Sequence, residues 1–358
     1  MHFGQFNLMG YRTPGTATHA IYDAAIAQVK AAEQAGFHMS WFAEHHFSNY
    51  GVCPSPLMMI ARCAGETTRI KLASGVVIVP LYDPARLLAE IGMVDAMTHG
   101  RLVLGIGSGY QPYEFERFGA DLTQSAQRVI EFMDMLDMAQ TRETFSFKGQ
   151  HYSMPETHIA PRTLHGMPDV FVAGDNPDLH RLAARRGYAV MVTPRHFTAE
   201  MLGKARDRFA GIYREVGADP ATMRFAALRH LCVTDSRAEA REFLDHARYQ
   251  IRLSQSLRRR EESIKGAMLI EKPWAGEMSI EEMEQHMLVG SAETIAERMA
   301  AEIRRAQPYH YLLHFEAAGS SLAWALRSIE AFATRVRPLL EKEFGPLERI
   351  GEPVAAAA

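Results

Sequence analysis

The sequence is poor in cysteine and has no long hydrophobic run. Its 358 residues include 3 cysteines, none of them in a Cys-x-x-Cys pair, so we expect neither a disulfide framework nor a cysteine zinc site. No apolar stretch approaches the roughly 20 residues that span a bilayer, and the amino terminus lacks the pattern of a signal peptide. We therefore expect a cytoplasmic protein that does not bind a membrane.

The sequence also lacks an excess of positive charge. It carries 39 Lys and Arg against 42 Asp and Glu, for a net charge of -3, and its arginine clusters at 185–186 and 258–260 are short. Because nucleic-acid binding needs a basic face, this balance argues against nucleic acid as a partner. With 47% hydrophobic residues, the chain can bury a large core in one or two α/β domains.

What the chain does contain is an alternation of strand and helix patterns along its whole length. Apolar runs rich in Val, Ile and Leu alternate with amphipathic stretches that begin at capping residues and end at glycine. We expect eight barrel strands, at residues 3–9, 39–43, 70–80, 101–106, 170–173, 189–192, 225–233 and 309–315. Eight such units predict an α/β fold, a (β/α)8 TIM barrel with insertions after strands 4 and 7. We expect a single barrel domain, 1–345, and a flexible tail, 346–358.

The glycines after the fourth strand allow a competing interpretation, a doubly wound sheet. Gly105, Gly107 and Gly109 follow an apolar run, as in a dinucleotide-binding loop. The Gly-x-Gly-x-x-Gly spacing is not met, because the third position holds Tyr110 or Pro112. The barrel is the better prediction. The glycines themselves indicate either a tight turn or a close approach of the backbone to a ligand.

Titratable residues follow the second strand directly. Glu44, His45 and His46 come where an apolar run ends, and the C-terminal ends of barrel strands are where active sites lie. A histidine there could act as general acid or base near neutral pH. The structural alternative is that Glu44 and His45 satisfy one another at the rim. Successive strand residues point to opposite faces, so His45 and His46 cannot easily bind one ion, and we expect no metal.

Taken together, the residues resemble the bacterial luciferase family of flavin-dependent monooxygenases over nearly the whole chain. The resemblance rests on Phe3-Gly4-Gln5-Phe6, the block from Trp41 to Phe47, Pro84-Ala85-Arg86, the run from Gly100 to Tyr110, Phe118-Gly119, Arg128-Val129-Ile130-Glu131, the run from Gly290 to Ile295, and His314-Phe315-Glu316-Ala317. It implies a barrel that binds reduced FMN at its C-terminal mouth. It also implies that O2 adds to the flavin and that the resulting flavin hydroperoxide oxygenates a small apolar organic substrate.

The resemblance also implies roles for particular residues. The residues implied for catalysis are His45, Glu44 and Glu114. Those implied for cofactor binding are Ser74, Gly75, Val76, Gly107, Ser108, Gly109, Arg128, Ala173, Gly174, Asp175 and Asn176. An unusual cis peptide is expected between Gly75 and Val76. From the residues alone, Arg128 is open to two interpretations, a solvated helix residue or a phosphate clamp.

Two departures from the family limit what is carried over. Luciferases proper have a reactive cysteine at the position of Gly107, so light emission from aldehydes is not expected. The loop at 174–178 is acidic and poor in hydroxyl groups for a phosphate site, so Arg128, backbone amides and the helix N-terminus would have to bind the anion.

The partners also follow from the resemblance. No nicotinamide fingerprint is present, so reduced flavin is expected from a separate flavin reductase, and family members commonly form homodimers. One alternative is an F420- or flavin-dependent oxidoreductase that transfers hydride without oxygen. Another is a non-catalytic flavin-binding partner subunit. The segment 257–288 is compatible with an active-site lid or with a surface excursion.

Overall fold

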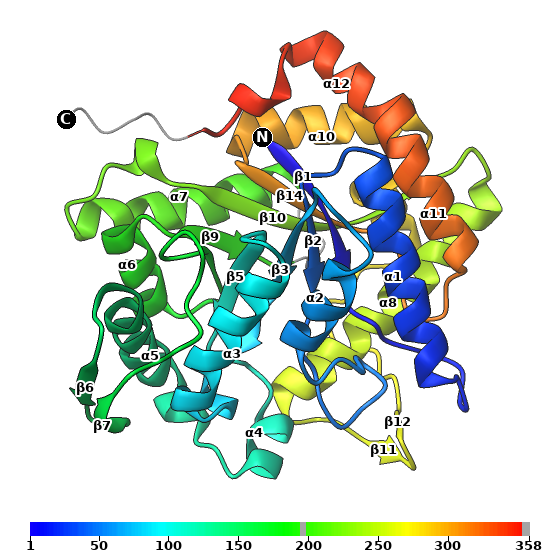
Figure 1. The fold of residues 1–358 in the computed structure, drawn as a ribbon. Coiled ribbons are helices and arrows are strands. Elements are labelled where there is room, and N and C mark those ends of the chain that lie inside the picture. Colours follow the sequence, from blue (N-terminus) through cyan, green and yellow to red (C-terminus); the bar gives the residue numbers. More distant parts are fainter. Residues whose placement is uncertain (194–197, 353–358) are drawn as a thin grey trace.

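The computed structural model describes residues 1–193 and 198–352, which form a closed barrel of eight parallel strands surrounded by helices (Figure 1). The strands follow one another round the barrel in sequence order, and the last pairs with the first. They are β1 (His2–Asn7), β2 (Met39–Phe42), β3 (Lys71–Ser74), β5 (Leu102–Gly107), β8 (Asp169–Ala173), β9 (Ala189–Val192), β10 (Phe225–Val233) and β14 (His310–His314). The predicted (β/α)8 barrel is confirmed.

Side chains fill the inside of the barrel. Consecutive strand residues point to opposite faces, so Phe6, Trp41, Val103 and Phe171 pack inside, whereas Phe42 packs outward against the helices. The rings of Trp41 and Phe171 meet edge to face, with centroids 4.9 Å apart. Because this layer closes the interior, a ligand site has to lie above it, at a mouth of the barrel.

Capping residues, proline and glycine set the ends of the helices that surround the barrel. Asp83 caps α3 by accepting from the backbone N–H of Arg86, and Pro84 occupies the first helical position. Gly187 ends α6 in the left-handed conformation, with φ of 67°. The helices are α1 (Thr18–Gln34), α2 (Pro56–Ala64), α3 (Pro84–Met97), α5 (Ser125–Thr141), α6 (Pro177–Arg186), α7 (Ala199–Glu215), α8 (Arg237–Arg259), α10 (Ala292–Ala306), α11 (Leu322–Ala331) and α12 (Arg337–Phe344).

Two insertions interrupt the alternation, after the fourth and seventh barrel strands as predicted. The first holds α4 (Pro112–Phe118), α5 and the hairpin of β6 (Phe145–Lys148) and β7 (Ser153–Thr157). The second follows α8 and contains a short hairpin, β11 (Ile264–Lys265) and β12 (Met268–Leu269), then α9 (Ile280–His286). A further short strand, β13 (Leu288–Gly290), pairs with β10 before α10 begins.

The expected strand at 70–80 is in fact two strands. β3 ends at Ser74, and β4 (Val77–Ile78) then pairs with β5. The peptide bond between Gly75 and Val76 is cis, as expected. The chain leaves the sheet in a turn that contains Pro80, which has no backbone N–H with which to extend the ladder.

The two ends of the described chain lie close together. The amino group of Met1 donates to the carbonyl oxygen of Leu347, and Leu347 is buried. The chain is therefore packed beyond the boundary expected at residue 345, and residues 353–358 of the expected tail lie outside the described residues. Within 1–193 and 198–352, no helix combines the length and the apolar character needed to cross a membrane.

Candidate active site

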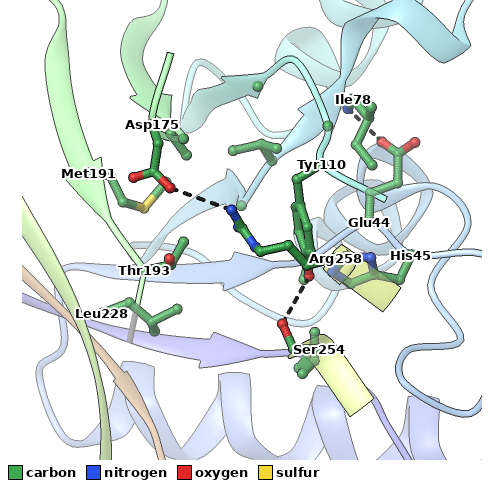
Figure 2. Close-up of a pocket in the computed structure, with 18 of the residues that line it drawn as sticks. Glu44, His45, Ile78, Tyr110, Asp175, Met191, Thr193, Leu228, Ser254 and Arg258 are labelled. Carbon is green, nitrogen blue, oxygen red and sulfur yellow. Dashed lines mark hydrogen bonds and ion pairs between the residues drawn. The ribbon is translucent and has the colours of Figure 1, made fainter. Parts of the chain in front are cut away.

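A cavity of about 560 Å³ opens at the C-terminal ends of the barrel strands (Figure 2). Its size falls within the range of pockets that bind cofactor-sized ligands. The residues that follow β2, β3, β5, β8 and β9 all contribute to its wall. Because barrel enzymes place their chemistry at this end, the cavity is the candidate active site.

The cavity brings most of the predicted site residues together. Those that line it are Glu44, His45, Gly75, Val76, Gly107, Ser108, Gly109, Ala173, Gly174, Asp175 and Asn176. Ser74, Glu114 and Arg128 are not among the lining residues. Ser74 is buried and donates to the carbonyl oxygen of Gly105 at 2.8 Å. This hydrogen bond joins the end of β3 to β5.

His45 is held at one ring nitrogen by buried groups. Its Nδ1 lies 3.1 Å from Oε1 of Glu114, which also accepts from the backbone N–H of His46 at 2.8 Å. The side-chain amide of Gln111 lies 3.1 Å from the same Nδ1 and 3.1 Å from the hydroxyl of Tyr110. A carboxylate can only accept, so Nδ1 donates to Glu114. His45 lines the cavity, so its other nitrogen, Nε2, is the one available to a ligand.

Glu44 is paired with His46 and not with His45. One carboxylate oxygen lies 3.0 Å from Nε2 of His46, and the other accepts from the backbone N–H of Ile78 at 3.0 Å and from the hydroxyl of Tyr82 at 2.9 Å. Burial raises the pKa of Glu44, although these three partners oppose the rise. The structural alternative, in which Glu44 and His45 satisfy one another, is therefore wrong. Across the described part of the chain, no group of three or more His, Cys, Asp or Glu could hold a metal ion.

Glycines occur in the cavity wall and directly behind it, at Gly105, where backbones approach closely. A Cβ atom at Gly105 would lie 1.9 Å from the carbonyl oxygen of Ser74, and one at Gly107 would lie 2.8 Å from the side chain of Val76. At Gly174, φ is +116° and a Cβ would meet nothing within 4 Å. The first two glycines are required by the packing of neighbouring strands, whereas the third leaves open space at the cavity wall. Backbone without side chains at these positions suits a flat cofactor that packs against it.

Charged groups gather at the end of the cavity beside α6. Asp175 follows β8 and precedes Asn176, which caps α6. One carboxylate oxygen of Asp175 lies 3.5 Å from Nη1 of Arg258, and the other lies 3.7 Å from Nη2 of Arg208. Arg128 lies apart from them: it donates to Gln124 at 3.4 Å and sits 5.3 Å from the ring of Tyr152.

One face of α8 was missed by sequence reasoning. Gln250, Ser254 and Arg258 recur every four residues and line the cavity, with Ile251 and Gln255 between them. The four-residue spacing of polar side chains on an otherwise amphipathic helix was the available signal. Oε1 of Gln250 is buried and has no hydrogen-bond partner within the described structure. It is therefore an unsatisfied acceptor beneath the cavity wall.

The inner part of the cavity contains two histidines from neighbouring strands, also missed by sequence reasoning. His230 on β10 and His314 on β14 both line it, with ring centroids 4.8 Å apart. Complete burial lowers the pKa of His314 to about 3, so this ring is neutral near pH 7. Glu316, two residues further along, does not line the cavity and instead accepts from Gln28 on α1.

A family model, related sequences and solved structures all match this chain. Residues 1–309 match the family model described as luciferase-like monooxygenase. The uncharacterized protein y4vJ of Sinorhizobium fredii is 35% identical over 350 residues, which cover 97% of this chain and 100% of that protein. The oxygenase component of flavin-dependent trigonelline monooxygenase from Acinetobacter baylyi is 30% identical over 243 residues, 67% of each chain. Monooxygenase RslO1 from Streptomyces bottropensis has a similar fold, with a TM-score of 0.80 at 21% identity over 94% of this chain and 99% of that chain.

Proposed function

The chain belongs to the luciferase-like monooxygenase family, and on that premise we propose that it uses reduced FMN and O2 to oxygenate a small, largely apolar organic molecule. The reduced flavin would come from a separate reductase. The Acinetobacter relative, which is named an oxygenase component, supports this division of labour. A homodimer is also proposed from the family resemblance, and the mass of the protein in sedimentation analysis would test it.

The cavity fits a flavin. Gly75 and Val76 would support the ring, the backbone from Gly107 to Gly109 would line its edge, and Gly174 to Asn176 would lie towards the phosphate. When bound, reduced FMN supplies the electrons and the reaction with O2. The protein's own task is to orient the ring, exclude water and hold a proton donor beside the substrate.

The placement of His45 is the observation that carries this proposal. Glu114 accepts from Nδ1, which directs Nε2 to the cavity and favours one tautomer. In that tautomer Nε2 carries a lone pair, so it could take a proton from a reacting group in the cavity and give it back as product forms. Glu114 does not line the cavity, so we propose it as a positioning residue.

Apolar side chains on several strands enclose the inner part of the cavity. Phe6 and Leu8 on and after β1, Met191 on β9 and Leu228 on β10 contribute carbon surface to its wall. Such a wall keeps water away from the reacting atoms and favours an apolar substrate.

The first test follows the reaction of reduced FMN with O2 in the presence of the protein. The protein is mixed anaerobically with reduced FMN and then with oxygenated buffer in a stopped-flow spectrophotometer. We expect oxidised FMN to return more slowly than it does without protein, because the enclosed cavity protects the reacting flavin from water. Return at the protein-free rate would contradict the oxygenase proposal. Oxygen-independent turnover with F420 would then favour the hydride-transfer alternative.

A substitution then tests His45 itself. His45→Ala should retain flavin binding but lower the share of consumed O2 that appears in product, rather than in H2O2, by about 100-fold. Glu114→Gln, which keeps an acceptor for Nδ1, should have a smaller effect and shift the pH profile of product formation. The matched control is His19→Ala, a surface histidine on α1. Equal coupling of O2 to product in His45→Ala and the parent would remove His45 from the mechanism.

A further inference from the structure

Two arginines from different helices converge on Asp175 at the outer end of the cavity. Nη1 of Arg258, on α8, lies 3.5 Å from Oδ2, and Nη2 of Arg208, on α7, lies 3.7 Å from Oδ1. Figure 2 shows Arg258 and Asp175 reaching toward one another across the space that the lining residues enclose. The guanidinium groups thus meet at a single carboxylate, on the loop where the flavin phosphate is expected.

These ion pairs are long and partly exposed to solvent, so another anion can replace the carboxylate. Charge-assisted N–H···O contacts are normally 2.7–2.9 Å long, and both distances here are greater. The side chains of Asp175 and Arg208 are 60% and 54% exposed, and pairs this exposed contribute little. A phosphate carries more charge than a carboxylate and offers three oxygens, so it can accept from both arginines at once.

Arg258 is held in place by contacts other than Asp175. Its guanidinium lies 4.5 Å from the ring centroid of Tyr110, a geometry that fixes the plane of the side chain. Its Nε is buried, and no partner for this donor occurs within residues 1–193 and 198–352. Arg258 therefore presents its terminal guanidinium nitrogens with the plane of the side chain already fixed. The N-terminus of α6, directly after Asp175, adds a favourable dipole for an anion.

We propose, as a deepening of the flavin-dependent function above and resting on it, that Arg258 and Arg208 bind the phosphate of FMN. In this proposal they act in place of Arg128. Asp175 competes with the phosphate for both guanidinium groups. The selectivity of the cavity for a phosphorylated flavin is then set by α7 and α8, and Asp175 limits how tightly that flavin is held.

The test compares reduced FMN with reduced riboflavin, which differ only in the phosphate. Binding is titrated anaerobically through the quenching of tryptophan fluorescence, since Trp41 packs beneath Gly75. The parent should prefer FMN, and Arg258→Gln and Arg208→Gln should each reduce that preference by about tenfold, with riboflavin affinity nearly unchanged. Asp175→Asn should increase the preference several-fold, because it removes the competing charge. The FMN preference should also fall as salt is added.

Two further variants make the result decisive. Arg259→Gln removes an exposed charge from the same helix and should leave the preference unchanged, whereas Arg128→Gln tests the residue expected from the sequence. Loss of the preference in Arg128→Gln, with retention in both Arg258→Gln and Arg208→Gln, would overturn the proposal. So would weaker FMN binding in Asp175→Asn. A parent protein that binds neither flavin would refute the flavin function itself, and retained riboflavin binding shows that each variant is folded.

Discussion

At the scale of single residues, one buried ion pair lies outside the candidate site. Arg229 on β10 and Glu302 on α10 form an ion pair in which both side chains are almost completely buried. The other carboxylate oxygen of Glu302 accepts from the hydroxyl of Tyr311 at 3.0 Å. Burial raises the pKa of Glu302, although Arg229 and Tyr311 oppose the rise. Arg229 and Glu302 stay paired because burying either charge without the other would cost several kcal/mol of folding free energy.

Breaking this pair should destabilise the protein strongly. Glu302→Ala leaves the Arg229 guanidinium buried without its partner, and we expect the free energy of unfolding to fall by about 3–5 kcal/mol. Urea denaturation at neutral pH measures the change. Glu90→Ala is the control, since Glu90 pairs with the exposed Arg86 and its loss should cost less than about 1 kcal/mol. The double variant Arg229→Met with Glu302→Leu should recover much of the loss. Similar losses in Glu302→Ala and Glu90→Ala would contradict this account.

The residues of the site could be predicted from sequence only where they sit in a local motif. His45 follows a strand directly, and its place at the mouth of the barrel could be read from that position. Its contact with Glu114 joins residues 69 positions apart, and the contact of Arg258 with Asp175 spans 83. Such pairs depend on how α4, α6 and α8 pack, which no local pattern reports.

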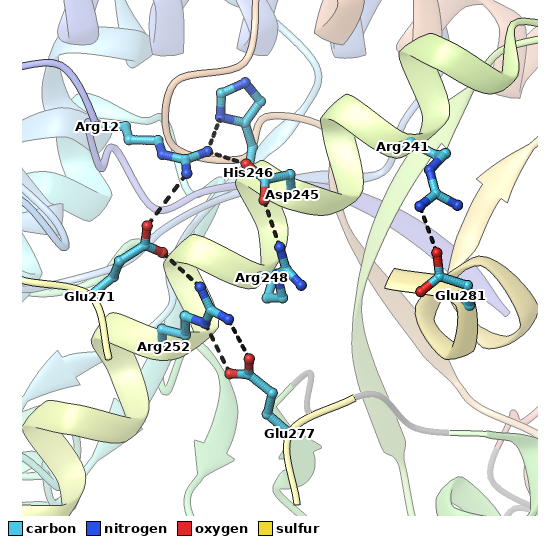
Figure 3. A network of polar contacts seen from close by, with 9 residues as sticks. All are labelled: Arg12, Arg241, Asp245, His246, Arg248, Arg252, Glu271, Glu277 and Glu281. Atoms are coloured by element: carbon cyan, nitrogen blue, oxygen red, sulfur yellow. Dashed lines mark hydrogen bonds and ion pairs between the residues drawn. The ribbon is translucent and has the colours of Figure 1, made fainter. Parts of the chain in front are cut away.

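At the scale of elements, a network of charges joins α8 to the insertion that follows it (Figure 3). Arg252 binds Glu277 and lies 3.3 Å from Glu271, while Arg12 lies 3.6 Å from Glu271 and 2.6 Å from Asp245. The expected lid or excursion at 257–288 is thus fastened to α8. Beyond Arg258, no described residue of this segment lines the cavity. The segment is anchored instead by buried side chains, among them Leu269 and Met283.

Removing ion pairs from this network should destabilise the insertion locally more than it destabilises the barrel. Glu277→Gln combined with Glu271→Gln removes both carboxylates that Arg252 contacts, and each partly buried pair contributes about 1 kcal/mol. We expect amide hydrogen exchange in 261–279 to quicken by about tenfold or more, with little change in the barrel strands. Glu281→Gln serves as the control, since Glu281 is 62% exposed in its pair with Arg241. Uniformly faster exchange across the protein would show that the network stabilises the whole fold instead.

The element bounds could be predicted closely because buried parallel strands are continuous apolar runs bounded by glycine and proline. β9 and β10 begin and end at the expected residues, 189–192 and 225–233. The division of the expected strand at 70–80 into β3 and β4 was not predicted, although Gly75 inside the run and the cis peptide expected there were the available signals. The hairpin of β6 and β7 was expected only as an insertion after the fourth strand. The backbone N–H groups of residues 150–152 donate to the carboxylate of Glu131, a contact between segments that no local pattern reports.

At the scale of the whole molecule, neutral histidines occur at both ends of the barrel. His314 lies at the cavity, and His310 lies towards the other end, where Nε1 of Trp41 donates to its Nε2 at 3.1 Å. Burial lowers the pKa of His310 well below its usual value, and it lowers that of His38 to about 4. An unfolded chain takes up protons at these groups below about pH 6.5, whereas the folded chain does so only at lower pH. Stability is therefore lost as pH falls from about 6.5 towards 3.

Glu316 has the opposite effect on the pH dependence. Burial raises its pKa to about 7, and Gln28 opposes the rise, so between about pH 4.5 and 7 the folded chain holds a proton that the unfolded chain has lost. Stability from this group therefore falls as pH rises through that range. Glu316→Gln keeps an acceptor for Gln28 and removes the titration. We expect the variant to be more stable than the parent at pH 8 by about 2 kcal/mol, and equal to it at pH 4. Urea denaturation at both pH values tests this, with the exposed Glu330→Gln as control. A gain of the same size at pH 4 would show that Glu316 acts through packing and not through its charge.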